Sequence, residues 1–120
     1  DTTVALGRQI LGKPRDAEDC ARMLSRLSGR WHEVLSAVHA VGRAIDRGLL
    51  CRSKVKFAEL APSAIEAYAA IGEGLGKAGA YAIQGRGALF VESIAGSYSG
   101  IMGLPLRETG LLLENRAREA

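Results

Sequence analysis

The chain has 120 residues, of which 48% are hydrophobic, so it suits one globular domain spanning 1–120 and is too short for two. Its formal net charge of +3 favours anionic small molecules but falls short of a nucleic-acid footprint, and its aromatic content of 5% offers few platforms for stacking bases. No apolar run reaches the ~20 residues of a membrane helix and no signal segment is recognisable. We therefore expect a cytoplasmic protein without nucleic-acid or membrane partners.

The first elements are two short strands and a helix. Residues 1–6 and 9–11 are rich in β-branched and apolar residues around a glycine turn, which predicts a pair of strands. Asp16 can cap a helix that ends near Gly29, because apolar residues follow at helical spacing. These residues are Cys20, Met23, Leu24 and Leu27. The spacing assigns this stripe to the core and not to a site.

Residues 31–41 and 50–60 predict two long strands joined by a polar turn over 42–48. On the second strand, apolar and small residues alternate with cations, as in a half-buried strand. The cations are Arg52, Lys54 and Lys56. They could face phosphate, but an ordinary solvated face of an edge strand explains them better.

The metal-ligating residue types form no cluster in the sequence. His32 and His39 fall on opposite faces of the predicted strand, so a structural role is favoured over metal binding. Cys20 and Cys51 lie in different predicted elements without metal-ligand spacing. Free buried thiols, which suit a reducing compartment, are favoured over a disulfide.

The second half alternates helical and strand patterns. Pro62 suits the first turn of a helix that runs into a glycine-rich stretch. Residues 89–94 and 98–103 predict two strands, and Pro105 begins a final helix with leucines on one face. The order of elements predicts an α/β fold, with a mixed twisted sheet and flanking helices.

The stretch 72–87 holds six of the 15 glycines and predicts a loop whose backbone approaches a ligand or adopts positive φ. Its polar side chains are Lys77, Tyr81, Gln84 and Arg86. These groups suit an anionic ligand with a hydrogen-bonding edge, such as a nucleotide, although a mobile surface loop is an equal alternative on composition alone. The glycine–lysine spacing and the residue after Lys77 exclude a Walker A loop.

Five motifs in register across the chain resemble the Maf family. They are Asp1-Thr2-Thr3-Val4, Leu11-Gly12-Lys13-Pro14, the segment 32–38, the block 77–85 (Lys-Ala-Gly-Ala-Tyr-Ala-Ile-Gln-Gly) and Gly103-Leu104-Pro105-Leu106. The block 77–85 is the most specific of them. The resemblance implies a cytoplasmic nucleoside triphosphate pyrophosphatase that forms a monophosphate and pyrophosphate, with a fold similar to that of inosine triphosphatases. It also implies a divalent cation, Mg²⁺ or Mn²⁺, and we expect a homodimer.

Carried over by motif, the resemblance gives roles to individual residues. Asp1 matches the catalytic aspartate that accepts a proton, while Lys13 and Lys77 match lysines of the phosphate site. Thr2 and Gln84 match positions tied to base selection, and threonine after the aspartate indicates the branch that takes dTTP and UTP. A carboxamide can donate and accept at once, as the imide edge of thymine or uracil requires. The alternative for Gln84 is an amide that braces the loop.

The chain departs from the family pattern in two respects. Gly76 and Ala82 stand where the family often has Asp and Gly, so the loop geometry could differ. Maf chains also open with a Ser-Pro-Arg-Arg-like phosphate-binding segment, and nothing in this sequence matches it. We therefore expect part of the amino-terminal region to be missing and these 120 residues alone to have little activity. The alternative is a non-catalytic nucleotide-binding or interaction module that keeps the Maf fold.

Overall fold

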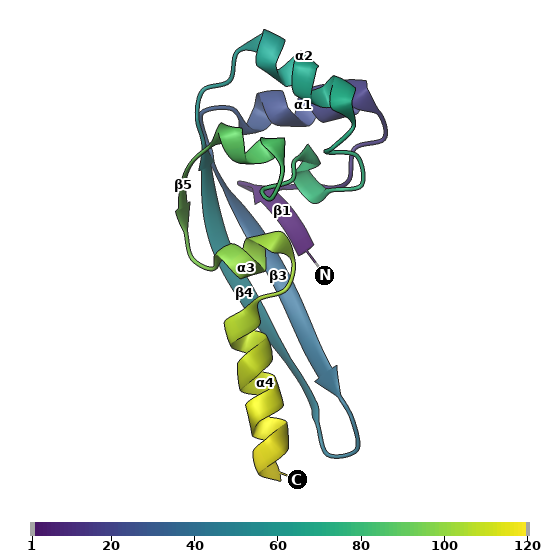
Figure 1. Ribbon diagram of the computed structural model, residues 1–120, viewed down its shortest axis with the longest axis vertical. Helices are drawn as coiled ribbons and strands as arrows, with labels where there is room; N and C mark the ends of the chain where they lie inside the picture. The colour runs from purple at the N-terminus through teal and green to yellow at the C-terminus, as the bar shows by residue number, and fades with distance from the viewer. Residues whose placement is uncertain (1, 120) are drawn as a thin grey trace.

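The computed structural model describes residues 2–119, with side chains as far as Glu114, and contains a five-stranded sheet flanked by helices (Figure 1). In spatial order the strands are β2 (Gln9–Leu11), β1 (Thr2–Leu6), β3 (Trp31–Val41), β4 (Asp46–Phe57) and β5 (Val91–Ala95). Every pairing among these described strands is antiparallel. The predicted α/β class with flanking helices is confirmed.

Two helices pack side by side at one end of the sheet, at the top of Figure 1. In α1 (Ala17–Leu27), the Asp16 side chain accepts a hydrogen bond from the Asp19 amide at 2.8 Å, which confirms the predicted cap. In α2 (Pro62–Ile71), the proline occupies the first turn, as predicted. Local signals at the amino ends of these helices were therefore sufficient to place them.

The long hairpin of β3 and β4 has a shorter turn than the sequence indicates. The Gly42 amide donates to the Ile45 carbonyl at 2.8 Å, and β4 begins directly afterwards, at Asp46. The predicted turn over 42–48 was wrong because its polar second half pairs with β3, where His39 contacts Asp46 across the strands. The strand also ends at Phe57 and not at residue 60.

The cations of β4 lie on its exposed face, but β4 is not the predicted edge strand. It pairs with β3 on one side and with β5 on the other. The Arg52 guanidinium lies 3.7 Å from the Glu33 carboxylate, and the Lys56 ammonium lies 3.7 Å from that of Glu92. Both cations therefore have acidic partners on a solvated face, which favours the solvated alternative over phosphate binding.

The segment 98–103, predicted as a strand, contains instead the five-residue helix α3 (Tyr98–Met102). The Ser97 hydroxyl caps this helix by accepting from the Gly100 amide at 3.0 Å. The Ser53 hydroxyl on β4 accepts from the Ser97 amide at 2.9 Å, so a contact with the sheet fixes the cap. The prediction failed because the helix depends on this tertiary contact.

Before α3, the chain forms two short 3₁₀ helices, η1 (Ala78–Ala80) and η2 (Arg86–Phe90). The predicted strand over 89–94 is thus shifted, because η2 takes its first residues and β5 starts at Val91. After α3, the chain continues into α4 (Leu106–Glu119), which confirms the predicted final helix after Pro105. In Figure 1, α4 runs beside the far end of the β3–β4 hairpin.

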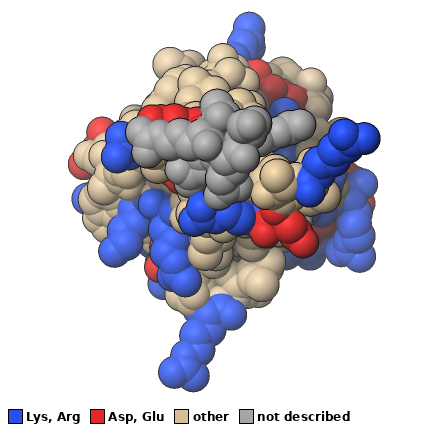
Figure 2. All heavy atoms as spheres, turned by 90° about the horizontal axis from the view of Figure 1, so that it is seen from below, with Lys and Arg blue, Asp and Glu red and all other residues tan. Residues whose placement is uncertain are grey.

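The core fills the space between α1, α2 and the near end of the sheet. Its fully buried side chains include Leu24, Leu27, Val55 and Phe57. The molecule is elongated, at 55 × 26 × 26 Å, because the hairpin and α4 extend beyond this core. Seen from that far end, Lys and Arg side chains are dispersed among acidic and uncharged residues (Figure 2). None of the helices in the described part of the chain has the length and apolarity needed to span a membrane.

Candidate functional site

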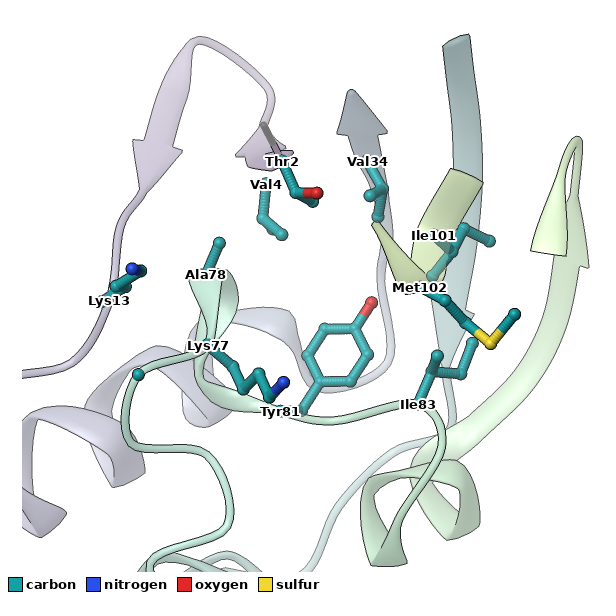
Figure 3. Close-up of a pocket in the computed structure, with 11 residues that line it drawn as sticks. Thr2, Val4, Lys13, Val34, Lys77, Ala78, Tyr81, Ile83, Ile101 and Met102 are labelled. Carbon is teal, nitrogen blue, oxygen red and sulfur yellow. The ribbon is translucent and has the colours of Figure 1, made fainter. Parts of the chain in front are cut away.

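A cavity of about 270 Å³ opens where β1, the glycine-rich stretch and α3 meet (Figure 3). Its lining comes from five separate segments of the chain. The lining residues are Thr2, Val4, Lys13, Val34, Gly76, Lys77, Ala78, Tyr81, Ile83, Ile101 and Met102. Three of the five residues predicted for the site, Thr2, Lys13 and Lys77, thus share one cavity.

A backbone contact joins the segments that carry the two lysines. The Gly79 amide donates to the Gly12 carbonyl at 3.1 Å, so the turn after Lys77 is tied to the residue before Lys13. Gly79 has a φ of +74°, and a Cβ atom there would lie 3.0 Å from Val4 Cγ1 on β1. Only glycine combines this conformation with such close packing. The glycine-rich stretch therefore brings Lys77 to β1, as a ligand-binding loop requires.

A second close approach shapes the start of the same stretch. A Cβ atom on Gly74 would lie 2.1 Å from the Ala80 carbonyl oxygen, so no other residue fits without moving the backbone. Ala80 itself is fully buried and has a φ of 68°, a conformation that L-residues rarely adopt. The predicted positive φ in this stretch is confirmed, and the loop is held in one compact shape by the core.

Helix α3 supplies the apolar wall opposite the lysines. The buried Ser36 hydroxyl on β3 donates to the Gly100 carbonyl and lies 3.4 Å from the Thr2 hydroxyl. This contact holds α3 against the sheet, and the α3 residues Ile101 and Met102 line the cavity (Figure 3). Sequence reasoning missed both residues because it assigned the segment to a strand. The cap pattern of Ser97 followed by Gly100 was the available signal.

Tyr81 and His32 form a buried polar pair at the inner end of the cavity. The Tyr81 hydroxyl and His32 Nε2 lie 2.7 Å apart, whereas His32 Nδ1 is buried and has no hydrogen-bond partner among the described residues. Burial lowers the pKa of His32 to about 4 and raises that of Tyr81. Both side chains are therefore neutral at pH 7. One ring nitrogen of His32 has a hydrogen-bond partner, as expected for a structural histidine, and the other has none among the described residues.

Gln84 lies outside the cavity lining. Its side chain is exposed, and its Nε2 donates to Met102 Sδ at 2.8 Å. Because Met102 lines the cavity, the carboxamide lies at the rim and contacts a lining residue without lining the cavity itself. Arg86, another polar group of the stretch, is also absent from the lining, and its backbone amide bonds to Glu73.

Glu73, which sequence reasoning did not single out, braces the segment that carries Gln84. Its carboxylate accepts hydrogen bonds from the Tyr68 hydroxyl, from the Arg86 amide at 3.0 Å and from the Gly87 amide at 3.1 Å. The bond from Tyr68, followed by that from Arg86, lowers the pKa of Glu73. Neither composition nor spacing distinguishes this carboxylate from a surface glutamate, so no sequence signal could have found it.

The proposed catalytic residue, Asp1, lies outside the described residues. Within residues 2–114, whose side chains the structure describes, no group of three or more His, Cys, Asp or Glu side chains could hold a metal ion. The charged groups that the described chain gives to the cavity are Lys13 and Lys77, which repel a cation. These residues do not fit a resident divalent metal.

Comparison with known proteins places these features in a family. Residues 1–116 match the family described as Maf-like protein. Over 116 residues the chain is 58% identical to the dTTP/UTP pyrophosphatase of Albidiferax ferrireducens, covering 96% of this chain and 58% of that protein. Over 113 residues it is 59% identical to the dTTP/UTP pyrophosphatase of Cupriavidus metallidurans, covering 94% and 56%. The protein of the same name from Ralstonia nicotianae is 57% identical over 118 residues, covering 98% and 57%.

These matches cover nearly all of the chain but only part of each relative. The chain spans a little over half the length of the curated relatives it matches, between 56% and 58% for the three named above. The cavity described above therefore belongs to a stretch of chain that corresponds to a little over half of each relative.

Proposed function

Because the chain belongs to the Maf family, we propose that it carries the nucleotide site of a pyrophosphatase that hydrolyses dTTP and UTP to the monophosphate and pyrophosphate. One observation supports this proposal above the others. Thr2, Lys13 and Lys77 come from separate segments and line the same cavity. Each residue belongs to a different motif of the family pattern, so their convergence is what a shared substrate requires.

The cavity has a cationic side and an apolar side (Figure 3). Lys13 and Lys77 lie on one side, where two ammonium groups can bind the negative oxygens of a triphosphate. Ile83, Ile101 and Met102 lie on the other side, where they can pack against the face of a base. A nucleotide placed across the cavity would therefore have its triphosphate beside the ammonium groups and its base against the apolar side chains.

The proposed chemistry is attack by water on the α-phosphorus. A bond forms between the water oxygen and phosphorus, the bond to the oxygen that bridges to the β-phosphorus breaks, and pyrophosphate leaves. Asp1 is proposed to accept the proton of the attacking water, and the lysines to stabilise the charge that develops on the phosphate oxygens. A positioned base typically contributes ~10²–10⁴ in rate, so Asp1→Asn should remove most turnover while binding persists.

Base selection is proposed to involve Thr2 inside the cavity and Gln84 at its rim. The contact of Gln84 with Met102 supports an indirect part in selection, because a change at the rim would move a residue that lines the cavity. Replacing Gln84 with Glu removes a donor and adds charge. We expect the preference for thymine and uracil over purines to fall by a few kcal/mol at most, about the range for an unpaired polar group.

Three further expectations stay predictions. The divalent cation follows from the resemblance, and the homodimer is a separate expectation. Among the described residues, no group of three or more His, Cys, Asp or Glu side chains could hold the cation. A cytoplasmic location is part of the proposal and is supported by Cys20 and Cys51, which are free and buried. Thiols in that state suit a reducing compartment.

The test is an assay of the protein in its full natural length with dTTP, UTP, dCTP and GTP, with Mg²⁺ or Mn²⁺ added. We expect pyrophosphate and monophosphate from dTTP and UTP, with Lys13→Ala and Lys77→Ala weakening binding and turnover together. Arg52→Ala is the matched control, because this cation lies on the exposed face of β4. Failure with every nucleotide would refute the proposal, whereas binding by calorimetry without turnover would favour the non-catalytic module.

A further inference from the structure

Tyr81 belongs to a buried cluster of rings with His32, Phe57, Tyr68 and Phe90, and it is the member of this cluster that lines the cavity. The side chain is only 6% exposed, and its ring makes edge contacts with Phe57 and His32, at centroid distances of 4.8 and 5.5 Å. Figure 3 shows the ring rising from the glycine-rich stretch, with its hydroxyl directed towards Val34 and Ile101. This packing leaves the hydroxyl oxygen little freedom of position.

The environment of His32 fixes which atom carries its proton. The side chain is 2% exposed, and burial keeps its pKa at about 4, so the ring holds a single proton at pH 7. A proton on Nδ1 would leave a buried N–H without a partner among the described residues, which is rarer and more costly than a buried acceptor without one. This favours the tautomer with the proton on Nε2, in which Nε2 donates to the Tyr81 oxygen 2.7 Å away.

This tautomer decides what Tyr81 can do. A hydroxyl that accepts from Nε2–H must direct its own hydrogen elsewhere, and the cavity is the open side of the ring. We propose that Tyr81 donates a hydrogen bond to a carbonyl oxygen of the pyrimidine base, with His32 as the residue that positions it. The inference rests on the proposed function, since it assigns part of the same site to the base.

The position of the hydroxyl favours the base over the phosphates as its acceptor. In Figure 3 the Tyr81 hydroxyl points towards the apolar residues Val34 and Ile101 and away from Lys13, while the Lys77 side chain reaches towards the opposite edge of the ring. Thymine and uracil present carbonyl oxygens but no charge, so a neutral donor among apolar side chains suits them. Triphosphate oxygens are better matched by the ammonium groups.

The first test needs no ligand. The chain contains two histidines, so nitrogen NMR of protein labelled at histidine gives two sets of ring signals, and His39→Gln identifies those of His32. Couplings from the ring protons show which nitrogen is protonated. We expect the Nε2–H form of His32 at pH 7. The Nδ1–H form would make Tyr81 the donor to histidine and would overturn the inference.

The second test measures binding to the protein in its full natural length. We expect Tyr81→Phe to weaken the binding of α,β-methylene UTP, measured by calorimetry, by about tenfold to a hundredfold, the range for one hydrogen bond. Binding of inorganic tripolyphosphate should not change. Tyr98→Phe is the control, because this tyrosine is 46% exposed and outside the cavity lining.

The outcomes separate this inference from the function on which it rests. Unchanged UTP-analogue binding by Tyr81→Phe, or an equal loss for tripolyphosphate, would overturn the assignment of the hydroxyl to the base. If the wild-type protein binds neither ligand, the proposed function fails as well. Because the NMR measurement uses the wild-type protein, it decides the direction of the hydrogen bond even if Tyr81→Phe does not fold.

Discussion

The two ends of the β3–β4 hairpin have the same strand pairing but different surroundings. At the near end, Val55 and Phe57 are fully buried beneath the helices and the glycine-rich stretch. At the far end, Val41 is 72% exposed and Leu50 is 54% exposed, although the ladder between the strands continues to the turn. Strand pairing therefore runs through the whole hairpin, whereas the main core packs against its near end, where the cavity lies.

This difference shows what holds the candidate site in shape. The far end has a small buried contact of its own, where Ile45 and Leu112 are 5% and 1% exposed. The near end combines the main core with polar contacts, of which the bond between His32 and Tyr81 is buried and those of Glu73 are partly buried or exposed. We infer that the site depends on packing and polar contacts at one end and is insensitive to change at the other.

The largest expected effect comes from truncating one aromatic side chain on β4. Phe57→Ala should lower the free energy of unfolding by about 3–5 kcal/mol, because it removes a buried ring that contacts His32, Tyr81 and Phe90. Leu50→Ala, on the same strand, should cost less than ~0.5 kcal/mol. Denaturant unfolding of the two variants measures the contrast, and similar losses would show that both ends are packed alike.

The second prediction concerns pH and the two histidines of β3. The pKa of His32 falls from 6.5 to about 4 on folding, so the folded protein binds fewer protons between these values. The stabilisation is full above pH 6.5 and is lost as the pH falls towards 4, by about 3 kcal/mol at ~1.4 kcal/mol per pKa unit. His32→Leu should therefore lose stability relative to wild type at pH 7, and this deficit should narrow on acidification.

The matched control for that prediction is His39→Leu, on the exposed part of the same strand. Its comparison with wild type shows how much of a change with pH arises from removing any histidine at the surface. Unfolding by urea at each pH gives both differences. A deficit of His32→Leu that stays constant with pH would mean that His32 is not held neutral by burial.

A smaller effect is expected at Glu73. Glu73→Gln should destabilise the protein by about 1–2 kcal/mol, because a neutral amide replaces a carboxylate that accepts three hydrogen bonds. Since the pKa of Glu73 is lowered in the folded state, this stabilisation is present above pH 4.5 and is lost as the pH falls below it. Glu66→Gln on α2 is the control, and an equal loss in both variants would contradict the bracing role.

The smallest expected effect is the difference between two alanine-to-glycine substitutions, one in α2 and one in the glycine-rich stretch. Ala67→Gly, on the exposed face of α2, should cost about 1 kcal/mol through helix propensity. Ala80→Gly should cost less, because a φ of 68° strains alanine and suits glycine. Thermal unfolding of the two variants gives the ranking, and the opposite order would indicate that burial of the Ala80 methyl group outweighs the strain.

The parts of the fold that local chemistry controls could be predicted from the sequence. Asp16 and Pro62 mark helix starts that need only neighbouring residues, and alternation along β4 gives its two faces. Helix α3 could not be predicted in the same way. Its cap is fixed by Ser53, a residue on another strand, and no pattern within 98–103 shows that contact.

The candidate site shows the same contrast between what neighbouring residues determine and what tertiary contacts determine. The motif resemblance selected Lys13 and Lys77, but their meeting depends on the bond between Gly79 and Gly12, which only the folded chain reveals. Gln84 was selected with them, yet its contact with Met102 places it at the rim. Ile101 and Met102, which reach the cavity through the tertiary placement of α3, were the lining residues that sequence reasoning missed.

The most direct test of the account is a crystal structure of the protein in its full natural length with α,β-methylene UTP. The account predicts the triphosphate beside Lys13 and Lys77, and the base against Ile83, Ile101 and Met102. The Tyr81 hydroxyl should lie within hydrogen-bond distance of a base carbonyl. A nucleotide bound elsewhere, with this cavity left without it, would contradict the central claim that β1, the glycine-rich stretch and α3 together form the nucleotide site.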